Sequence, residues 1–429
     1  DVIPRKGFST PASPEFNKDP LLWAGTPKFR YQLHLALEEK LARIADHAPT
    51  VPVRHNPRAN GRRAVVASGV AAAYTAEALR DLGLGDSLPF YQVLQPFPLH
   101  ERFRRHLADA YEEVLVLEET TGIIEMQLAD RGRIRGKLNG VVPRVGELLP
   151  ETIAAILAGF AGVETTIPSL TPTPGRRPTL CAGCPHRASF FAIKKAAPRG
   201  IYTSDIGCYT LGLNLKAVDT VLCMGAAISQ AAGFYHAYKN EAKPPDIVAT
   251  IGDSTFFHAG VPALIDAVVQ NVRFVLVILD NRTTAMTGSQ PTPASGRGAS
   301  GEPLRAVDLE TLVKGCGVAF VEVGDPYDTP KFTDLVKRAA AFSRSDGPAV
   351  VIARHPCIID LARQGDAGGR IQVMVTEDCD GCGYCHQHFE CPALTAGNDG
   401  RCTTVDPLAC SGCGVCVNVC PKGAIVAMP

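Results

Sequence analysis

The sequence predicts an α/β protein with two doubly wound parallel-sheet domains and a small cysteine-rich domain at its C-terminus. In two stretches, short apolar strands alternate with amphipathic helices, which is the pattern of parallel sheets with crossover helices. Four prolines between residues 165 and 178 separate these stretches, as expected of an interdomain linker. Nine of the 15 cysteines follow residue 378, so the last part of the chain is a different kind of domain.

The same patterns predict the boundaries of five parts. Residues 1–60 are an N-terminal helical linker segment, because apolar residues recur at helical spacing from position 33 to 44. Residues 61–163 form the first sheet domain, with strands at 64–67, 90–94 and 114–117 and helices at 69–82 and 100–111. The linker covers 164–179. The second sheet domain covers 180–366, with strands at 221–223, 246–251, 273–279, 318–323 and 349–353, and the cysteine-rich domain covers 370–429.

The overall composition argues against several classes of function. Lys and Arg together number 43, as do Asp and Glu, so the formal net charge of zero predicts neither a nucleic-acid partner nor an anionic membrane surface. No apolar run approaches the roughly 20 residues of a membrane helix. The chain opens with Asp1 and shows no apolar leader, so we expect a cytoplasmic protein. Since it lacks an initiator Met, it can also be part of a longer gene product.

The C-terminal domain carries two runs of three cysteines, spaced two residues apart, each followed by a Cys-Pro step. In two-cluster ferredoxins, the fourth cysteine of each run ligates the other cluster. We therefore expect one 4Fe–4S cluster on Cys379, Cys382, Cys385 and Cys420, and a second on Cys391, Cys410, Cys413 and Cys416. The gap between Cys385 and Cys391 is two residues longer than usual, which lengthens one loop. Zinc is the alternative, but zinc sites pair two Cys-x-x-Cys steps.

Polar residues follow two neighbouring apolar strands of the second sheet domain. The strand at 246–251 ends in Gly252, Asp253 and Ser254, and the strand at 273–279 ends before Asn281. Open α/β sheets bind ligands at the carboxyl ends of such strands, and a following helix N-terminus favours phosphate. Asp253 and Asn281 offer the hard oxygen ligands that Mg²⁺ prefers, while Gly252 and Gly225 let the backbone approach a diphosphate. A strand–turn–helix without a ligand is the alternative.

Four further cysteines are candidates for a third cluster. They are Cys181, Cys184 and Cys208, which precede the Gly252 turn, and Cys357, which follows the last strand of the sheet. Convergence of these residues at one end of the sheet would place a third 4Fe–4S cluster beside the diphosphate site. The alternative is that Cys208 and Cys357 are buried thiols, as unpaired cysteines commonly are.

Three longer motifs carry a resemblance to a known family. The turn at 252–258 and the segments 205–209 and 283–291 look like those of the α subunits of indolepyruvate:ferredoxin oxidoreductases, among the 2-oxoacid:ferredoxin oxidoreductases. The resemblance covers nearly the whole chain, and the first sheet domain resembles the transketolase C-terminal domain. It implies that the second sheet domain binds thiamine diphosphate. It also implies that Mg²⁺ is held by Asp253, Asn281 and the carbonyl of Thr283, and that the third cysteine set is a cluster proximal to the thiamine.

The resemblance further implies a reaction and its partners. An aryl 2-oxoacid such as indolepyruvate would be oxidatively decarboxylated with coenzyme A to an acyl-CoA and CO₂, and three clusters would pass electrons to ferredoxin. His258 is a candidate proton shuttle or substrate contact, and His186 and Arg187 are candidate contacts to the diphosphate or the substrate carboxylate. Thiamine activation needs a glutamate from a pyrimidine-binding domain. A partner chain or a missing N-terminal region must supply it, so we expect a hetero-oligomer that also contains a smaller γ-like subunit.

Three alternatives remain open at this point. The substrate could be phenylglyoxylate or another 2-oxoacid, because partner chains share the pocket. The chain could be an electron-transfer subunit with a vestigial thiamine fold, which the intact Asp253 and Asn281 disfavour. A non-oxidative thiamine-dependent decarboxylase would have no use for the clusters.

Overall fold

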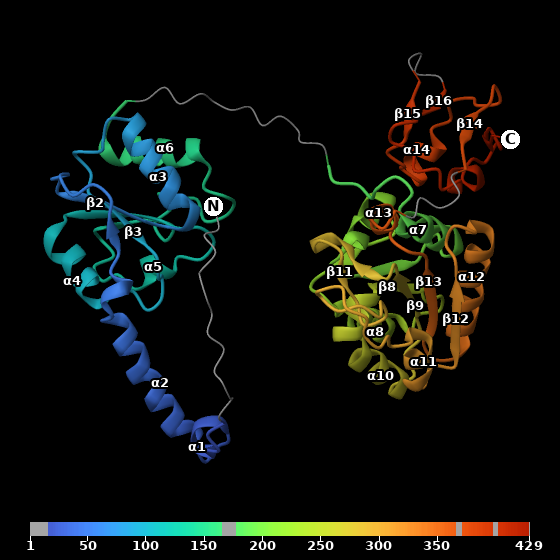
Figure 1. Ribbon diagram of the computed structural model, residues 1–429, viewed down its shortest axis with the longest axis horizontal. Coiled ribbons are helices and arrows are strands. Elements are labelled where there is room, and N and C mark those ends of the chain that lie inside the picture. The colour runs from blue at the N-terminus through green and yellow to red at the C-terminus, as the bar shows by residue number, and fades with distance from the viewer. Residues whose placement is uncertain (1–15, 165–176, 366–370, 398–401, 429) are drawn as a thin grey trace. The chain divides into compact units, whose positions relative to one another are not determined.

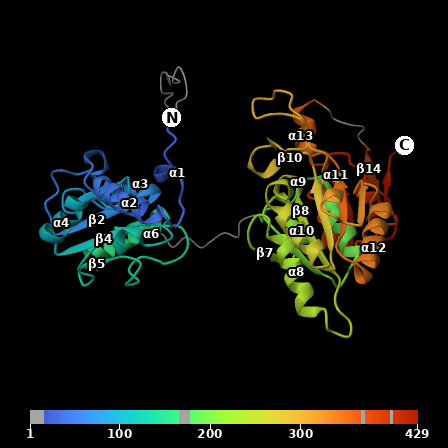
Figure 2. The ribbon, with the colours of Figure 1, turned by 90° about the horizontal axis from the view of Figure 1, so that it is seen from below.

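The computed structural model describes residues 16–164, 177–365, 371–397 and 402–428, which form two compact units divided between residues 174 and 175 (Figure 1). The predicted linker at 164–179 lies largely outside the described residues. Each unit has its own central sheet with helices on both sides, as Figure 2 shows from a second direction. None of the helices in the described ranges combines the length and apolar character that a membrane span requires.

The first unit is built on a five-stranded sheet in the order β1-β3-β2-β4-β5. Its strands are β1 (Val53–Arg54), β2 (Arg63–Ser68), β3 (Phe90–Val93), β4 (Glu113–Leu117) and β5 (Ile134–Arg135). The last four are parallel, whereas β1 adds to the edge of the sheet in the antiparallel direction. The three longer strands were predicted, but β1 and β5 have two residues each, too few to show a periodic pattern.

Alternating residues of these strands bury two opposite faces. Val65 and Ala67 of β2 pack under α3 (Gly69–Asp81) and α6 (Pro150–Ala161). Ala64 and Val66 pack under α4 (Glu101–Ala110) and α5 (Ile123–Met126). This arrangement is the doubly wound fold that the sequence predicts. The N-terminal helical segment is also present, as α1 (Pro20–Trp23) and α2 (Arg30–Ala45).

The second unit has a six-stranded, wholly parallel sheet in the order β12-β13-β9-β8-β6-β7. Its strands are β6 (Ile201–Ser204), β7 (Thr220–Val221), β8 (Ile247–Gly252), β9 (Val275–Asp280), β12 (Phe320–Gly324) and β13 (Ala349–Arg354). Five of them were predicted within a few residues, and β6 was missed. Every residue of β8 and β9 is buried, as expected for central strands covered on both faces.

Helices cover both faces of this sheet. One face carries α7 (Pro185–Ala196) and α12 (Thr329–Ser345), and the other carries α8 (Ala226–Tyr238), α10 (Val261–Val269) and α11 (Leu309–Gly315). From β6 the chain continues to β7 on one side, whereas from β8 it continues to β9 on the other. The strand order therefore reverses between β6 and β8, and open α/β sheets bind ligands at such a point.

The cysteine-rich tail packs against this sheet domain within the second unit. It consists of two small antiparallel ribbons, β14 (Val373–Val375) with β17 (Ile425–Ala427) and β15 (Leu394–Ala396) with β16 (Thr403–Val405). Two short helical segments, α14 (Tyr384–His388) and η5 (Val415–Asn418), carry some of the cysteines. Ala188 and Phe191 of α7 enter the core of the tail, so α7 serves both domains (Figure 1).

Candidate functional site

The site begins at the carboxyl end of β8, where the strand turns into the short helix α9 (Asp253–Thr255). Asp253 is only 2% exposed, and its Oδ2 has no hydrogen-bond partner among the described residues. Burial, followed by the charge of Asp280, raises the pKa of Asp253 to about 7. A buried carboxylate with a free oxygen is unfavourable unless a cation compensates it, so this position fits a divalent metal ion.

Asn281 and Thr283 follow the neighbouring strand, β9, and both are buried. Asn281 Oδ1 accepts a hydrogen bond from the backbone N–H of Thr283 at 3.2 Å. Between them, Arg282 has a φ of 63°, an unfavourable conformation for a residue with a side chain. The turn is held by the small ribbon of β10 (Thr283–Thr284) and β11 (Gln290–Pro291), which keeps Asn281 at the end of the sheet.

His186 joins this group from α7. Its Nε2 accepts a hydrogen bond from Asn281 Nδ2 at 3.3 Å, and burial lowers the pKa of His186 to about 4. The imidazole is therefore neutral at pH 7, which agrees with Nε2 acting as an acceptor. In the structure His186 contacts Asn281. Its contact to the diphosphate or the substrate carboxylate stays a prediction.

Arg187 does not join the group, although it is the next residue along α7. Its guanidinium donates to the carbonyls of Leu180, Phe389 and Glu390, on the side of the helix that faces the tail. The structure gives Arg187 these carbonyl partners, and its contact to the diphosphate or the substrate carboxylate stays a prediction. Successive residues of an α-helix point about 100° apart, so His186 and Arg187 serve different neighbours.

Sequence reasoning did not assign a role to Asp205 or Tyr209. Both lie next to the glycines of the site, Gly225 and Gly252. Asp205 is fully buried after β6, and it accepts hydrogen bonds from the Tyr209 hydroxyl and, at 2.9 Å, from the backbone N–H of Gly225. A Cβ on Gly252 would lie 2.6 Å from the Tyr209 ring. Gly225 has a φ of 85°, and a Cβ there would lie 2.5 Å from the Cβ of Ala259. Both glycines are therefore required where the backbone passes close to these neighbours.

Two other predicted residues lie at the edge of this arrangement. Ser254 is half-buried in α9, directly after Asp253. His258 is exposed on η3 (Phe256–Gly260), a π-helical turn that continues α9. Turns of this kind are frequent at functional sites, and the role of His258 as a proton shuttle or substrate contact stays a prediction.

The four cysteines of the proposed third cluster line a single cavity of about 250 Å³, which His186 and Asn281 also line. They come from three segments: the loop before α7, which holds both Cys181 and Cys184, the start of η2 (Cys208–Leu215) and the loop before α13 (Ile358–Arg363). The backbone N–H of Cys357 donates to the carbonyl of Asn281 at 3.1 Å, which joins the cysteine set directly to the β9 turn. The cavity thus connects the predicted cluster position with the predicted metal position.

Eight of the nine cysteines of the tail also separate into two groups, each around a small cavity. One cavity is lined by Cys379, Cys382, Cys385 and Cys420, and the other by Cys391, Cys410, Cys413 and Cys416. These are the sets expected from the sequence spacing. No three His, Cys, Asp or Glu side chains in the described ranges lie close enough to hold a single metal ion. In a 4Fe–4S cube each thiolate binds a different iron.

Comparisons with known proteins agree with this division. Residues 205–353 match the family described as thiamine pyrophosphate enzyme, C-terminal TPP binding domain, and residues 403–426 match the 4Fe-4S binding domain. A solved 2-oxoglutarate:ferredoxin oxidoreductase from Magnetococcus marinus covers 44% of this chain and 70% of its own, with 21% identity and a TM-score of 0.38. That similarity is too weak to support an inference about the site.

Curated relatives are much closer. The indolepyruvate oxidoreductase subunit IorA of Archaeoglobus fulgidus is 40% identical over 99% of this chain and 68% of its own length. The subunit of the same name from Methanothermobacter marburgensis is 35% identical over 98% of this chain and 68% of its own length. With this extent of similarity, and with thiamine diphosphate and iron–sulfur domains in the expected order, the chain belongs to the family of the indolepyruvate oxidoreductase subunit IorA.

Proposed function

We propose that this chain is the thiamine-binding and electron-transferring subunit of a ferredoxin-dependent 2-oxoacid oxidoreductase. Its substrate would be an aryl 2-oxoacid, indolepyruvate or a similar acid, and its products an acyl-CoA and CO₂. The names of its relatives support the substrate class. The observation that carries the proposal is the 250 Å³ cavity, because Asn281 and His186 share it with four cysteines. An electron acceptor held there would lie next to the thiamine.

The proposal gives each site residue a role. Mg²⁺ would be held by Asp253, Asn281 and the carbonyl of Thr283. The metal ion would be a positively charged partner for the buried Asp253 carboxylate, whose Oδ2 has no hydrogen-bond partner among the described residues. Gly252 and Gly225 would let the backbone approach the diphosphate, with Ser254 at the start of the following helix. His186 would hold the Asn281 amide in place through its neutral imidazole. His258 remains a candidate for contact with a substrate bound between chains.

The reaction needs both kinds of cofactor. Oxidation of a 2-oxoacid with coenzyme A yields an acyl-CoA, carbon dioxide, two electrons and one proton. Thiamine diphosphate supplies the electron sink for loss of carbon dioxide. Iron–sulfur clusters take up electrons one at a time. A cluster held by Cys181, Cys184, Cys208 and Cys357 would receive the electrons first, and the two tail clusters would carry them to ferredoxin.

The active enzyme would be a hetero-oligomer. The chain spans about two thirds of the length of its relatives. The pyrimidine-binding domain that thiamine needs would come from another chain or from a further region of the same protein. A smaller γ-like subunit would complete the assembly. Purified enzyme for any activity test must therefore contain these partners.

The first test is the anaerobic iron and sulfide content of the assembled enzyme, together with EPR before and after addition of indolepyruvate and coenzyme A. Three clusters would give about twelve irons per chain, at four per cube. Substrate should then produce reduced-cluster signals. Phenylglyoxylate, assayed in parallel, would show whether another aryl 2-oxoacid is the better substrate.

A matched pair of cysteine variants makes this test specific. Cys357→Ser should lower the content to about eight irons and abolish reduction by substrate, because Cys357 lines the cavity at the thiamine site. Cys316→Ser should change neither, since Cys316 packs against the core on the other face of the sheet. Eight irons in the unaltered enzyme would contradict the third cluster. Twelve irons that no 2-oxoacid reduces would favour an electron carrier with a vestigial thiamine fold.

A further inference from the structure

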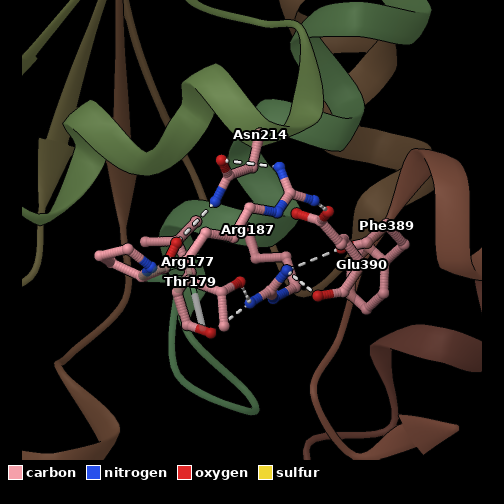
Figure 3. Close-up of polar contacts among 8 residues, drawn as sticks. Arg177, Thr179, Arg187, Asn214, Phe389 and Glu390 are labelled. Carbon is pink, nitrogen blue, oxygen red and sulfur yellow. Dashed lines mark hydrogen bonds and ion pairs between the residues drawn. The ribbon is translucent and has the colours of Figure 1, made fainter. Parts of the chain in front are cut away.

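A buried arginine lies between the sheet domain and the cysteine-rich tail. Arg187 of α7 is 1% exposed, and Figure 3 shows its guanidinium enclosed by residues of both domains. Nη1 donates to the carbonyl of Phe389 at 2.8 Å and to that of Glu390, both in the tail. Nη2 donates to the carbonyl of Leu180 and, at 3.4 Å, to the Thr179 hydroxyl, both before α7. One side chain therefore connects two segments about 200 residues apart.

Each of these segments leads directly into a cysteine of a candidate cluster. Leu180 precedes Cys181 of the set at the thiamine site, and Glu390 precedes Cys391 of the second tail set. The two sets are also adjacent through the loop at 182–183, whose residues line the cavity of the second tail set. Arg187 thus lies at the junction between the two sets, whereas none of its hydrogen bonds to described residues involves a cysteine of the remaining set around Cys379.

The positive charge of Arg187 has no carboxylate beside it in the described part of the chain. All its acceptors are neutral carbonyl or hydroxyl oxygens, and the Glu390 carboxylate pairs with Arg177 instead (Figure 3). Burial of such a cation is costly unless a negative group compensates it. Burial lowers the pKa of Arg187, and the thiolates of Cys391 and Cys184 oppose that change most strongly. Thiolates that hold clusters in the two cysteine sets would supply this negative charge.

We propose that Arg187 is a positioning residue whose charge raises the reduction potentials of the proximal cluster and the second tail cluster together. A cluster becomes more negative when it accepts an electron, so a buried cation nearby stabilises its reduced form. Its hydrogen bonds also fix the two cysteine loops relative to each other. This inference rests on the proposed function, because it uses the cluster assignment made there.

The test is an anaerobic redox titration of the assembled enzyme, followed by EPR and carried out without substrate. Arg187→Met should lower the potentials of the proximal and second tail clusters, with about a tenfold loss of reduced form at a fixed potential, or 59 mV for one electron. The cluster on Cys379, Cys382, Cys385 and Cys420 is the internal reference and should not shift. Arg187→Lys should keep both potentials close to those of the unaltered enzyme. The double variant Arg177→Gln/Glu390→Gln removes the neighbouring ion pair without changing the net charge, and it should also leave them unchanged.

A second pair of variants covers the case in which Arg187→Met loses its clusters. Thr179→Asp adds a carboxylate next to Nη2 without removing the arginine, and it should lower the same two potentials. Thr179→Asn, of similar size and neutral, should not. Unchanged potentials in Arg187→Met or Thr179→Asp at full iron content would overturn the proposal, as would an equal shift of all three clusters. The iron content and substrate reduction of the unaltered enzyme test the proposed function separately.

Discussion

Replacement of Asp253 by asparagine should stabilise the metal-free protein while abolishing its response to metal. In the absence of a cation, one oxygen of the buried carboxylate has no hydrogen-bond partner in the described part of the chain, and burial together with Asp280 raises the pKa of Asp253 to about 7. A carboxyl with a raised pKa stabilises the fold only when protonated, so this contribution is lost as the pH rises through 7. Asparagine has the same shape and stays neutral at every pH.

The size of the effect follows from the two pKa values. The ordinary pKa of an aspartate is 3.8, and each pH unit between that value and about 7 is worth about 1.4 kcal/mol. At pH 8 the ionised carboxylate therefore costs about 4 kcal/mol, which Asp253→Asn should recover. At pH 5 the folded protein keeps Asp253 protonated, and the gain falls to about 1.5 kcal/mol. For a domain of this size, 1 kcal/mol corresponds to roughly 2–4 °C in melting temperature.

Anaerobic thermal melting with a chelator, at pH 8 and pH 5, measures this difference. The variant should melt roughly 8–16 °C higher than the unaltered chain at pH 8 and only a few degrees higher at pH 5. Added Mg²⁺ and thiamine diphosphate should then raise the melting temperature of the unaltered chain but not of the variant. Ser254→Ala, at the half-buried next position, is the control and should keep the same pH dependence as the unaltered chain.

An Asp253→Asn variant that melts below the unaltered chain at pH 8 in chelator would show that the protein itself satisfies the carboxylate. An equal gain at both pH values would show that ionisation of Asp253 does not destabilise the fold. A variant that still responds to Mg²⁺ would show that the metal binds elsewhere.

Two further substitutions probe the backbone of the site and the packing of the tail. Gly225→Ala should weaken thiamine diphosphate binding at least tenfold by titration calorimetry, because its φ of 85° is unfavourable for alanine and the new Cβ would meet Ala259. Gly233→Ala, on the same helix with open space at its Cβ among the described residues, should bind normally; equal binding by both variants would contradict the steric argument. Phe191→Ala should cost about 3–5 kcal/mol, since the ring is 2% exposed and packs 5.8 Å from the ring of Phe389. Limited proteolysis should then cleave the tail first, and unchanged resistance would show that the tail is held by other contacts.

The sequence was sufficient wherever the relevant residues are close along the chain or lie on regular elements. Apolar runs indicated the long strands of both sheets, and the spacing of the tail cysteines predicted the two groups that line separate cavities. Asp253 and Asn281 could be paired because each directly follows a strand, and neighbouring parallel strands end at the same edge. Two-residue strands such as β1 and β5 were missed, because an edge pairing depends on the neighbour rather than on a pattern.

Tertiary structure decided which way individual side chains face. His186 and Arg187 are adjacent in one motif, and the sequence alone suggested the same role for both. In the folded protein, His186 meets Asn281 and Arg187 meets the tail at Glu390, because successive helical residues diverge by about 100° and α7 is covered on two sides. The sequence determined which residues can bind cofactors, since ligand chemistry resides in residue types and their spacing. Only the packing of α7 between sheet and tail determined that the buried Arg187, whose acceptors among the described residues are neutral oxygens, lies between two sets of cysteines.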